Sequence, residues 1–402
     1  MSDMSLSEES QEVTAAQPLR VAMIGTGFMG AAHSQAWRVA PRFFDLPLAP
    51  EMSVIVGRDA AKTQAAAGQL GWAGASADWR EVVHRGDVDL IDICSPGESH
   101  AEIAIAALTA GKHVLCEKPL ANTVEQAREM AEAARAAADR GVYSMVGFSY
   151  RRVPALSFAR QLVRSGRIGE VRQVRAAYLQ DWLVDENGPM TWRLDKKLAG
   201  SGSLGDIGAH AVDAVQFITG QAVEQVSGYL RTFVAERPLL GETIGLSGTA
   251  SSERGRVTVD DAAWFTGLLS GGAVASFEAT RYAAGRKNGL KIEIFGSRGS
   301  VVFDLEKMNE LEFYDGTDAA GEQGFRRIFV TEPEHPYAAA WWPTGHGLGY
   351  EHPFSHQVRD LVFDIAEGRQ PEPSFDDGLQ VQQVLHAVER SAAGNGIWTS
   401  IF

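Results

Sequence analysis

Cysteine is scarce in this sequence: only Cys94 and Cys116 occur among 402 residues. Each lies inside an apolar, strand-like run, so we expect two buried free thiols in a reducing compartment. Two thiols at such positions provide no disulfide framework. The class of small secreted proteins that depend on disulfides is therefore excluded.

The sequence also lacks any run of about 18 apolar residues, the length that a membrane-spanning helix requires. It has no excess of basic residues: 37 Lys and Arg stand against 51 Asp and Glu, and the net charge is −14. Such a charge would repel the phosphates of nucleic acids and of anionic lipids. We therefore expect a small neutral ligand, and neither nucleic acid nor a membrane as a partner.

A signal peptide is missing from the first 17 residues, which are acidic and polar without a basic segment followed by an apolar one. We predict that residues 1–17 form a disordered tail and that the protein is cytoplasmic. Hydrophobic residues make up 45% of the chain, which is long enough for two domains. We place them at residues 18–147 and 148–402.

The first domain alternates short apolar runs with segments of helical periodicity. The apolar runs lie at residues 19–25, 52–56, 88–94, 113–116 and 142–148, and the helical segments at 28–40, 59–70, 100–111 and 123–140. Helices between nearly continuous apolar strands indicate a parallel sheet covered on both faces. The pattern predicts a doubly wound Rossmann domain.

The first turn of this domain reads GTGFMG, with glycines at 25, 27 and 30. Gly25 permits a tight turn, Gly27 permits close approach of a pyrophosphate, and Gly30 permits close packing of the helix. The amides that open the helix, at Phe28 and Met29, would then face the phosphates. Glycine-rich turns also serve as simple connections, but the position between strand and helix favours a dinucleotide site.

Two further segments end strands of the same sheet, CSPGESH at residues 94–100 and CEKP at 116–119. Ligands of such sheets bind beyond the carboxyl ends of the strands. The three segments should therefore share one crevice, which adds five candidate cofactor-binding residues: Ser95, Pro96, His100, Glu117 and Lys118. An unpartnered buried ammonium is costly, so we expect Lys118 at the edge of the cofactor. The alternative is a solvent-facing ion pair with Glu117.

The second domain contains strand-like runs at residues 171–182, 262–269, 273–282, 289–296 and 299–306, after a helix at 154–169. Strands that follow one another without helices indicate a largely antiparallel sheet. We expect an α+β domain with a large open sheet. One face should cover the Rossmann domain, and the other should meet another subunit.

In GSLGDIGAHAVD, residues 202–213, Asp206 and His210 are four residues apart and should share one face of a helix. Oxidation of a secondary alcohol needs a base, and histidine titrates near neutral pH. We assign His210 as the base and Asp206 as a hydrogen-bonding partner of the substrate, with Asp213 orienting the ring. Lys118 would supply positive charge to the developing alkoxide. The alternative is a core histidine bonded to Asp206.

The segments GTGFMG, CSPGESH, GKHVLCEKPL (111–120) and GSLGDIGAHAVD, in this order and spacing, resemble the Gfo/Idh/MocA family of sugar and polyol oxidoreductases. The resemblance implies that Lys118 reaches both the nicotinamide ribose and the substrate hydroxyl, and that Pro119 follows a cis peptide bond. It places Trp192 and Arg193 near the nicotinamide. By analogy with the family, the protein should be a homotetramer or homodimer.

Within the family, YRRVPA (150–155), YLQDW (178–182), TWR (191–193) and GLGYEHPF (347–354) resemble sugar 3-dehydrogenases of the levoglucosan type. We therefore expect an enzyme that oxidises C3 of an anhydro-sugar or a related sugar. The alternatives are a dehydrogenase of inositol, another polyol or a glucoside, a redox glycosidase, and a dinucleotide sensor without activity. Candidate contacts to sugar hydroxyls are Arg152, His346 and Gln180. Aromatic surfaces against the sugar ring could come from Tyr178, Trp182, Trp192 and Tyr350, although core packing is the alternative for each.

The cofactor should be NAD, which the nearest resemblance implies. NAD enzymes usually carry an acid at the end of the second strand, but this chain has Gly57 and Arg58 there and Asp59 slightly later. Because Arg58 could stack on adenine or bind a 2′-phosphate, NADP stays possible. No metal is expected: His352 and His356 have a suitable spacing, but Pro353 begins a helix between them and no further ligand motif follows.

Overall fold

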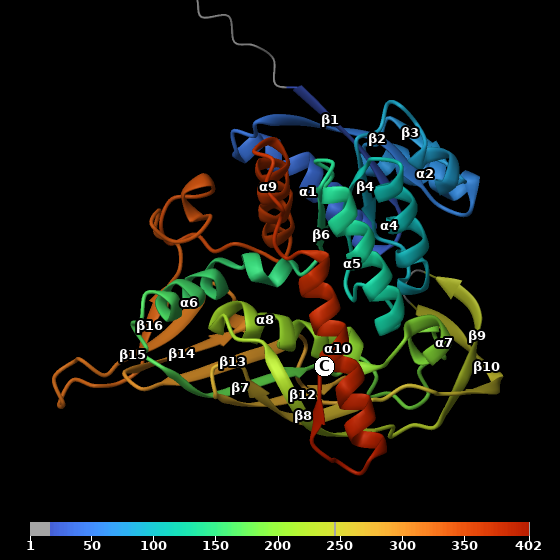
Figure 1. Ribbon diagram of the computed structural model, residues 1–402. Helices are drawn as coiled ribbons and strands as arrows, with labels where there is room; N and C mark the ends of the chain where they lie inside the picture. Colours follow the sequence, from blue (N-terminus) through green and yellow to red (C-terminus); the bar gives the residue numbers. More distant parts are fainter. Residues whose placement is uncertain (1–16, 245–246, 402) are drawn as a thin grey trace, which may run out of the picture.

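The computed structural model describes residues 17–244 and 247–401. The predicted tail lies outside the described residues, except for Gln17, which begins the first strand. The two predicted sheets are both present, one above the other in Figure 1. Three helices, α6, α8 and α10, lie between the large lower sheet and the upper domain.

The first sheet has six strands in the order β3-β2-β1-β4-β5-β6, and every pair is parallel. Its apolar strands are almost entirely buried because helices cover both faces, as the sequence pattern predicts. The strands are β1 (Gln17–Ile24), β2 (Leu48–Val56), β3 (Gly74–Ser76), β4 (Leu90–Ile93), β5 (His113–Cys116) and β6 (Ser144–Val146).

The helices of this domain follow the strands in alternation. They are α1 (Phe28–Phe43), α2 (Ala60–Leu70), α3 (Trp79–Val83), α4 (His100–Thr109) and α5 (Val124–Ala138). Two apolar clusters lie on opposite sides of the sheet, one with α1 and α2 and the other with α3, α4 and α5. The arrangement confirms the doubly wound Rossmann fold.

A helix from the distant C-terminal part of the chain completes one face of this domain. Helix α9 (His352–Ala366) packs beside α1, and Phe354, Val358 and Leu361 join the cluster formed by the strands and Trp37. These apolar residues recur at helical spacing, which gives α9 a stripe to bury. One part of residues 148–402, the helix α9, therefore packs on the first sheet and not on the second (Figure 1).

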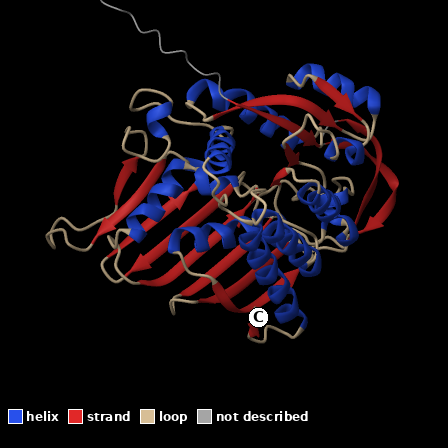
Figure 2. Ribbon diagram, turned by 45° about the horizontal axis from the view of Figure 1, so that its top comes forward, coloured by secondary structure: helices blue, strands red, loops and turns tan. Residues whose placement is uncertain are grey.

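The second sheet has nine strands in the order β16-β15-β14-β13-β7-β12-β11-β8-β17, which lie side by side in Figure 2. Only β7 and β12 pair in parallel. The strands are β7 (Val171–Leu179), β8 (Val223–Arg231), β11 (Ala262–Leu269), β12 (Val274–Thr280), β13 (Gly289–Gly296), β14 (Gly299–Asp304), β15 (Glu310–Asp315), β16 (Arg326–Phe329) and β17 (Thr399–Ser400). A separate hairpin consists of β9 (Glu236–Ile244) and β10 (Ser247–Arg256).

One face of the nine-stranded sheet carries the remaining helices, α6 (Pro154–Arg164), α8 (Ala209–Thr219) and α10 (Phe375–Ala393). The short helix α7 (Lys196–Ala199) lies near the hairpin. We predicted that one face of this sheet would cover the first domain directly. Instead, these helices lie between the sheet and the first domain. Tyr229 and Trp264 are cross-strand partners, so they share a face, and both are exposed.

A single large apolar cluster joins residues of α4 and α5 to residues of α8, α10 and the second sheet. The two domains therefore share a continuous core. Among the described residues, no helix is both long enough and apolar enough to cross a membrane.

Candidate active site

The GTGFMG turn follows β1 and opens α1, and each glycine meets a different requirement. Gly25 has φ +121°, and a Cβ there would lie 2.7 Å from the Cys94 carbonyl carbon. A Cβ at Gly30 would lie 2.2 Å from the Gly25 oxygen, so the helix can pack against the turn only with glycine. At Gly27, by contrast, nothing lies within 4 Å of the Cβ position. The turn leaves free space at Gly27 beside the first amides of α1, which is where a pyrophosphate fits.

We expect Gly27→Ala to weaken NADH binding by at least about tenfold while the melting temperature stays close to that of the wild type, because the added methyl group meets only the space for phosphate. Fluorescence titration with NADH and thermal unfolding measure the two effects. Gly68→Ala is the control, since its Cβ also meets nothing within 4 Å but lies in α2. A loss of stability without a loss of affinity would contradict this interpretation.

The segment after β4 lies against the same turn. A Cβ at Gly25 would come within 2.9 Å of the Ser95 amide nitrogen, which places Ser95 and Pro96 next to the glycines. His100 is buried and joins two loops, with Nδ1 3.1 Å from the Pro119 oxygen and Nε2 2.9 Å from the Ser95 oxygen. His100 therefore holds the two cofactor-facing loops together, and its ring nitrogens have no free position for a ligand.

Glu117, Lys118 and Pro119 follow β5, and the Lys118–Pro119 peptide bond is cis, as the resemblance implies. The Glu117 carboxylate contacts His33, with Oε1 3.0 Å from Nε2. The other ring nitrogen of His33 lies 2.9 and 3.0 Å from the two oxygens of Asp92, which also accepts a hydrogen bond from the Trp37 indole. Both nitrogens thus face carboxylates, which accept hydrogen bonds and do not donate them when ionised. With both carboxylates ionised, this geometry favours a His33 ring that carries a proton on each nitrogen.

Sequence reasoning missed this buried network below Glu117. Its signal was Asp92, an acid in the middle of the apolar run LIDIC, since a buried carboxylate normally has a partner. Burial disfavours the charged form of His33, but Asp92 raises the pKa of His33 well above its usual value. The charged ring fixes Glu117 and, through it, the start of the loop that carries Lys118.

We expect the free energy of unfolding to fall as the pH rises above about 6.5, the ordinary pKa of histidine. Because the pKa of His33 is higher in the folded state, its stabilisation is complete below the unfolded pKa of about 6.5 and is lost as the pH approaches the folded value. The slope is at most about 1.4 kcal/mol per pH unit. Other buried histidines, such as His113, have lowered pKa values and change stability only below this range.

Denaturant unfolding of the wild type and of His33→Gln at several pH values measures this effect. The difference between the two proteins should shrink as the pH rises, because the variant has no proton to lose at this position. A difference that is independent of pH would show that His33 is not protonated in the fold.

Lys118 points to the second domain and not to Glu117. Its Nζ donates to the Asp206 carbonyl oxygen at 2.8 Å and lies 3.5 Å from the Asp206 carboxylate. The lysine side chain is 15% exposed, so it is neither sealed in the core nor free in solvent. The alternative of an ion pair with Glu117 is wrong, and residues from both domains meet at this point.

Asp206 lies in a π-helical turn, Leu204–Gly208, which precedes α8. Our expectation of one regular helix through Asp206 and His210 is therefore wrong. Asp260 anchors the start of the turn, because its carboxylate accepts hydrogen bonds from the amides of Gly202 and Leu204, both at 2.8 Å. π-helical turns occur often at functional sites.

The Asp206 carboxylate is surrounded by positive charge. Burial opposes ionisation, but Lys118, Arg281 and Arg193 lower the pKa of Asp206, so the group is ionised. Arg281 lies 3.6 Å from the carboxylate and is fully buried. Sequence reasoning missed Arg281, although an arginine directly after the apolar strand β12 could have indicated it. Arg193 stacks on Trp192 at 4.4 Å, and its charge acts on Asp206.

His210 is the second residue of α8, directly after the π-helical turn, and is 9% exposed. Its ring stacks on Tyr150 with centroids 4.5 Å apart, and Nδ1 has no hydrogen-bond partner among the described residues. The other buried histidines differ: His33, His100 and His356 each have partners at both ring nitrogens, and His352 has one at Nδ1. The alternative of a core histidine bonded to Asp206 is wrong, since no such bond forms.

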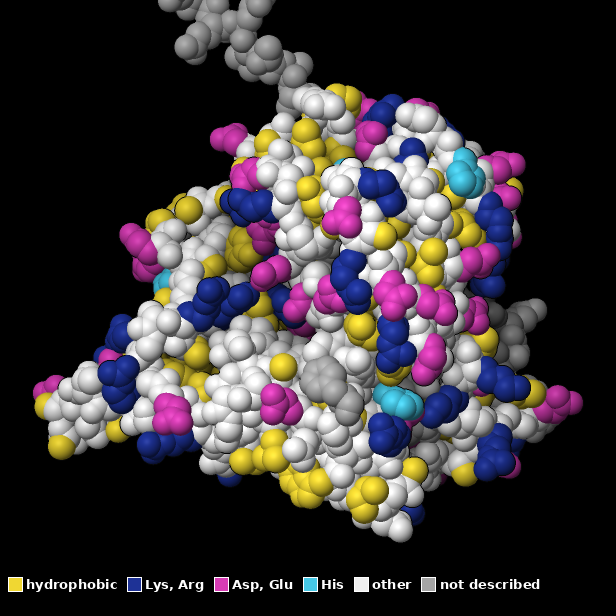
Figure 3. Space-filling view, viewed as in Figure 1, with side chains coloured by type: hydrophobic (Ala, Val, Ile, Leu, Met, Phe, Trp, Pro, Cys, Tyr) yellow, Lys and Arg dark blue, Asp and Glu magenta, His cyan; other side chains and the backbone are white. Residues whose placement is uncertain are grey.

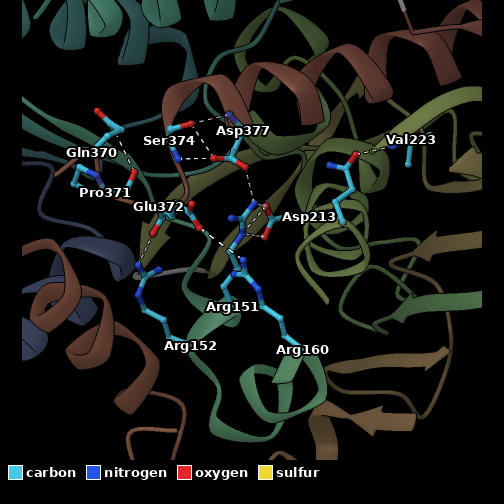
Figure 4. A network of polar contacts seen from close by, with 11 residues as sticks. Arg151, Arg152, Arg160, Asp213, Val223, Gln370, Pro371, Glu372, Ser374 and Asp377 are labelled. Carbon is cyan, nitrogen blue, oxygen red and sulfur yellow. Dashed lines mark hydrogen bonds and ion pairs between the residues drawn. The ribbon is translucent and has the colours of Figure 1, made fainter. Parts of the chain in front are cut away.

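Burial, followed by the charge of Lys118, lowers the pKa of His210 well below its usual value. The ring is therefore neutral near pH 7 and can accept a proton. We predicted that Asp213 orients the His210 ring, but this is wrong. Both carboxylate oxygens of Asp213 accept from Arg151 Nε at 3.0 Å (Figure 4). Asp213 instead fixes α8 to the turn Ser149–Arg152, which carries Tyr150.

A chain of polar side chains extends from Tyr150 across the second sheet. The Tyr150 and Tyr178 hydroxyls are 3.0 Å apart, and Tyr178 donates to the Asn288 oxygen at 2.7 Å. Gln180 donates to the same oxygen at 2.8 Å and accepts from the Trp182 indole. The structure thus links the predicted Gln180 to the ring that packs on His210, and it adds Asn288, which no sequence motif indicated.

Tyr350 lies near the dinucleotide turn, stacked on Phe28 with ring centroids 6.1 Å apart and 38% exposed. Burial, followed by the charges of Tyr150 and Glu117, raises the pKa of the Tyr350 hydroxyl. A segment from the distant C-terminal part of the chain therefore borders the site.

Arg152 does not join this group. Its Nε donates to the Asp360 carboxylate at 2.8 Å. Its Nη2 donates to the Glu372 carbonyl oxygen at 2.6 Å (Figure 4). These contacts hold it on the far side of the turn from Tyr150, so the prediction of a sugar contact is withdrawn. The two histidines considered for a metal also have hydrogen-bond partners. His352 Nδ1 accepts from the Gly349 amide. His356 accepts from the Trp341 indole at Nε2 and lies 2.9 Å from the Arg152 carbonyl oxygen at Nδ1.

Arg58 is exposed after β2, as the sequence suggested. Asp59 caps α2, because its side chain accepts from the Lys62 amide at 3.0 Å. The acid that follows the second strand is thus used by the helix, and Arg58 is the charged side chain left free to meet an adenosine ribose.

Comparisons with known proteins agree with this geometry. The family model described as oxidoreductase family, NAD-binding Rossmann fold, matches residues 19–148, and that of the GFO/IDH/MocA C-terminal domain matches residues 157–302. An oxidoreductase domain protein from Kribbella flavida, known as a crystal structure, is 62% identical with a TM-score of 0.93, and the match covers 96% of this chain and 100% of that one.

Several relatives have named activities, among them two sugar dehydrogenases. Levoglucosan dehydrogenase from Pseudarthrobacter phenanthrenivorans is 40% identical over 94% of this chain and 97% of its own length. A structure of levoglucosan dehydrogenase with NADH and levoglucosan has a TM-score of 0.90 and covers 96% of this chain and 100% of that one. D-glucoside 3-dehydrogenase from Escherichia coli is 33% identical over 53% of this chain and 57% of its own length.

Proposed function

The chain belongs to the Gfo/Idh/MocA family of NAD-dependent oxidoreductases, and from this premise we propose that it oxidises the C3 hydroxyl of an anhydro-sugar such as levoglucosan to the ketone. One observation carries the assignment of the site. The buried His210 has an unpartnered Nδ1 and stands in the positive field of Lys118, whereas Nδ1 of every other buried histidine in the described residues has a hydrogen-bond partner. A ring held neutral and unsatisfied is suited to accept a proton.

The mechanism divides the oxidation between the two domains. His210 accepts the proton of the sugar hydroxyl, while Lys118 holds positive charge next to the oxygen as alkoxide character develops. The GTGFMG turn would hold NAD, which would supply the hydride acceptor for the same carbon. Asp206 fixes the lysine through its carbonyl oxygen and balances its charge through the carboxylate.

The surroundings of His210 suit a sugar. Gln180 and Asn288 present amide groups that can bond to hydroxyls, and Tyr350 and Trp182 offer partly exposed aromatic surfaces. Sugar sites combine such polar groups with aromatic faces. We propose Gln180 and Tyr350 as substrate contacts, together with Lys118, Asp206 and His210.

A substrate screen tests the proposal. NADH formation is measured with levoglucosan, glucose, methyl glucosides and myo-inositol, and the product is identified by NMR. We expect the highest kcat/KM with levoglucosan, a 3-keto product, and a preference for NAD over NADP. A higher kcat/KM with myo-inositol, or a preference for NADP, would overturn the corresponding part of the proposal.

The relative from Escherichia coli favours one alternative substrate class, the D-glucosides. If the protein used them in a redox glycosidase cycle, the hydride would return to the product and NADH would not accumulate. Equal amounts of NADH and keto-sugar would exclude that cycle and support a simple dehydrogenase.

We further propose a cytoplasmic homo-oligomer, a tetramer or a dimer. The two free thiols fit a reducing compartment, and the exposed Tyr229, Trp264 and Val274 on the nine-stranded sheet fit a subunit contact. Sedimentation analysis would measure the mass, and a monomer at micromolar concentration would contradict the assembly.

A further inference from the structure

A cavity of about 510 Å³ lies apart from His210, on the other side of the turn Ser149–Arg152. It is bordered by this turn, α6, α9 and the segment 369–372. In Figure 3, basic and acidic side chains lie side by side in the hollow between the upper and lower halves of the molecule. The lining residues with charged side chains are Arg151, Arg152, Arg160, Arg359, Arg369, Asp360, Asp364 and Glu372.

Five guanidinium groups thus line this cavity with three carboxylates, and two of them, Arg151 and Arg369, are also paired with acids outside the lining. Asp360 lies 2.8 Å from Arg152 and 2.7 Å from Arg359, and Asp364 lies 2.7 Å from Arg369. These two acids are therefore neutralised by neighbours. Arg151 is bound to Asp213 behind the cavity wall (Figure 4).

Two of the arginines have hydrogen-bonding capacity that the described residues do not use. Arg152 is 4% exposed, and its Nη1 is buried without a partner. Arg160 makes no hydrogen bond among the described residues, and its only ion pair, with Glu372, spans 3.8 Å. The Arg160 side chain is 26% exposed and can be hydrated, but leaving the buried Nη1 of Arg152 unpaired is costly, so this atom needs an acceptor.

The guanidinium planes are held in position by aromatic rings. Arg160 lies over Phe217 at 4.2 Å, and Arg359 lies over Phe363 at 4.4 Å. Stacking fixes the faces of the groups and leaves their N–H edges for a ligand. Fixed arginine forks are the usual partners of phosphate and carboxylate oxygens, and a doubly charged tetrahedral anion offers the most acceptors in the least volume.

We propose that this cavity binds a phosphate group, either as inorganic phosphate or as a small phosphate monoester. Arg152 Nη1 and Arg160 donate to the phosphate oxygens. Glu372, which is 70% exposed at the rim, lies on the side where the organic part of a monoester would emerge, and its carboxylate can accept from a hydroxyl. The site is separate from the NAD and sugar sites, because Tyr150 faces His210 while Arg151 and Arg152 face the cavity.

Isothermal titration of the NAD-loaded, full-length protein tests this site, since bound NAD blocks the only other phosphate position that we propose. The ligands are inorganic phosphate and glycerol 3-phosphate, with sodium chloride at matched ionic strength as the reference. We expect saturable binding of both ligands. The ligand with the lower Kd, inorganic phosphate or glycerol 3-phosphate, shows whether the site prefers the free ion or a monoester. Absence of saturable binding of both up to about 10 mM would overturn the proposal.

Three variants place the binding at this cavity. Arg160→Gln should weaken binding by at least about tenfold, as expected for the loss of a charge-assisted hydrogen bond. Arg164→Gln removes an exposed arginine from the same helix outside the cavity and should leave the affinity within about twofold. Glu372→Gln removes the competing carboxylate and should tighten binding, a gain that misfolding cannot produce. Equal affinities of Arg160→Gln and Arg164→Gln would place the anion elsewhere.

Discussion

Replacing His210 with alanine is expected to lower kcat by roughly 10²- to 10⁴-fold, the range for loss of a general base. Burial and Lys118 lower the pKa of this ring, so it is neutral and ready to accept a proton at pH 7. NADH binding should persist, because the dinucleotide turn lies in the other domain. Steady-state kinetics and fluorescence titration with NADH measure the two effects separately.

The pH profile gives a second readout for His210. In the wild type, kcat/KM should fall on the acidic side only below the ordinary histidine pKa of about 6.5, because the lowered pKa keeps the ring neutral above it. This acidic limb should change in His210→Ala. His386→Ala is a suitable control, since His386 is exposed on α10. An unchanged kcat in His210→Ala would remove this residue from the mechanism.

Lys118→Ala should lower kcat by about 10²- to 10³-fold, as expected for loss of a preorganised charge next to the reacting oxygen. It should also weaken NADH binding, because the ammonium lies between the cofactor domain and Asp206. The loss has a structural side: the variant leaves the Asp206 carbonyl oxygen without its donor and the carboxylate with one cation fewer. The measurements are kcat, KM and the Kd for NADH.

Lys62→Ala is the matched control, because Lys62 also lies in the first domain but is 86% exposed. Lys118→Arg separates charge from geometry. A guanidinium keeps the charge but cannot place a single compact donor on the Asp206 carbonyl, so only partial recovery of kcat is expected. Full activity in Lys118→Ala would contradict the role of this residue in both steps.

Much of the fold could be predicted from the sequence because its signals are local. Apolar strands alternating with helical segments indicate a parallel sheet, and the structure confirms it. The position of α9 could not be predicted in this way. Its apolar spacing shows that one face must be buried, but Phe354 and Val358 carry no information about which of two sheets receives them.

The candidate site could be predicted only as far as motifs define it. Spacing placed Asp206 and His210 together, but the π-helical turn changes the relation that a regular helix would give them. Asp213 was assigned to the nearest histidine in sequence, whereas Arg151, 62 residues away, is its partner in space. Arg281 pairs with Asp206, and His33 pairs with Asp92 and Glu117. These partners are distant in the sequence, so such pairings depend on tertiary structure.

The docking of α9 on the first sheet has a consequence for biosynthesis. The ribosome completes all six strands of that sheet when residue 146 has been made, yet Trp37, Val21 and Met23 stay without part of their cover until Phe354, Val358 and Leu361 emerge. A truncated protein ending near residue 148 would expose this apolar surface to water and to chaperones. Anyone wishing to produce the nucleotide-binding half by itself should therefore graft residues 352–366 onto it.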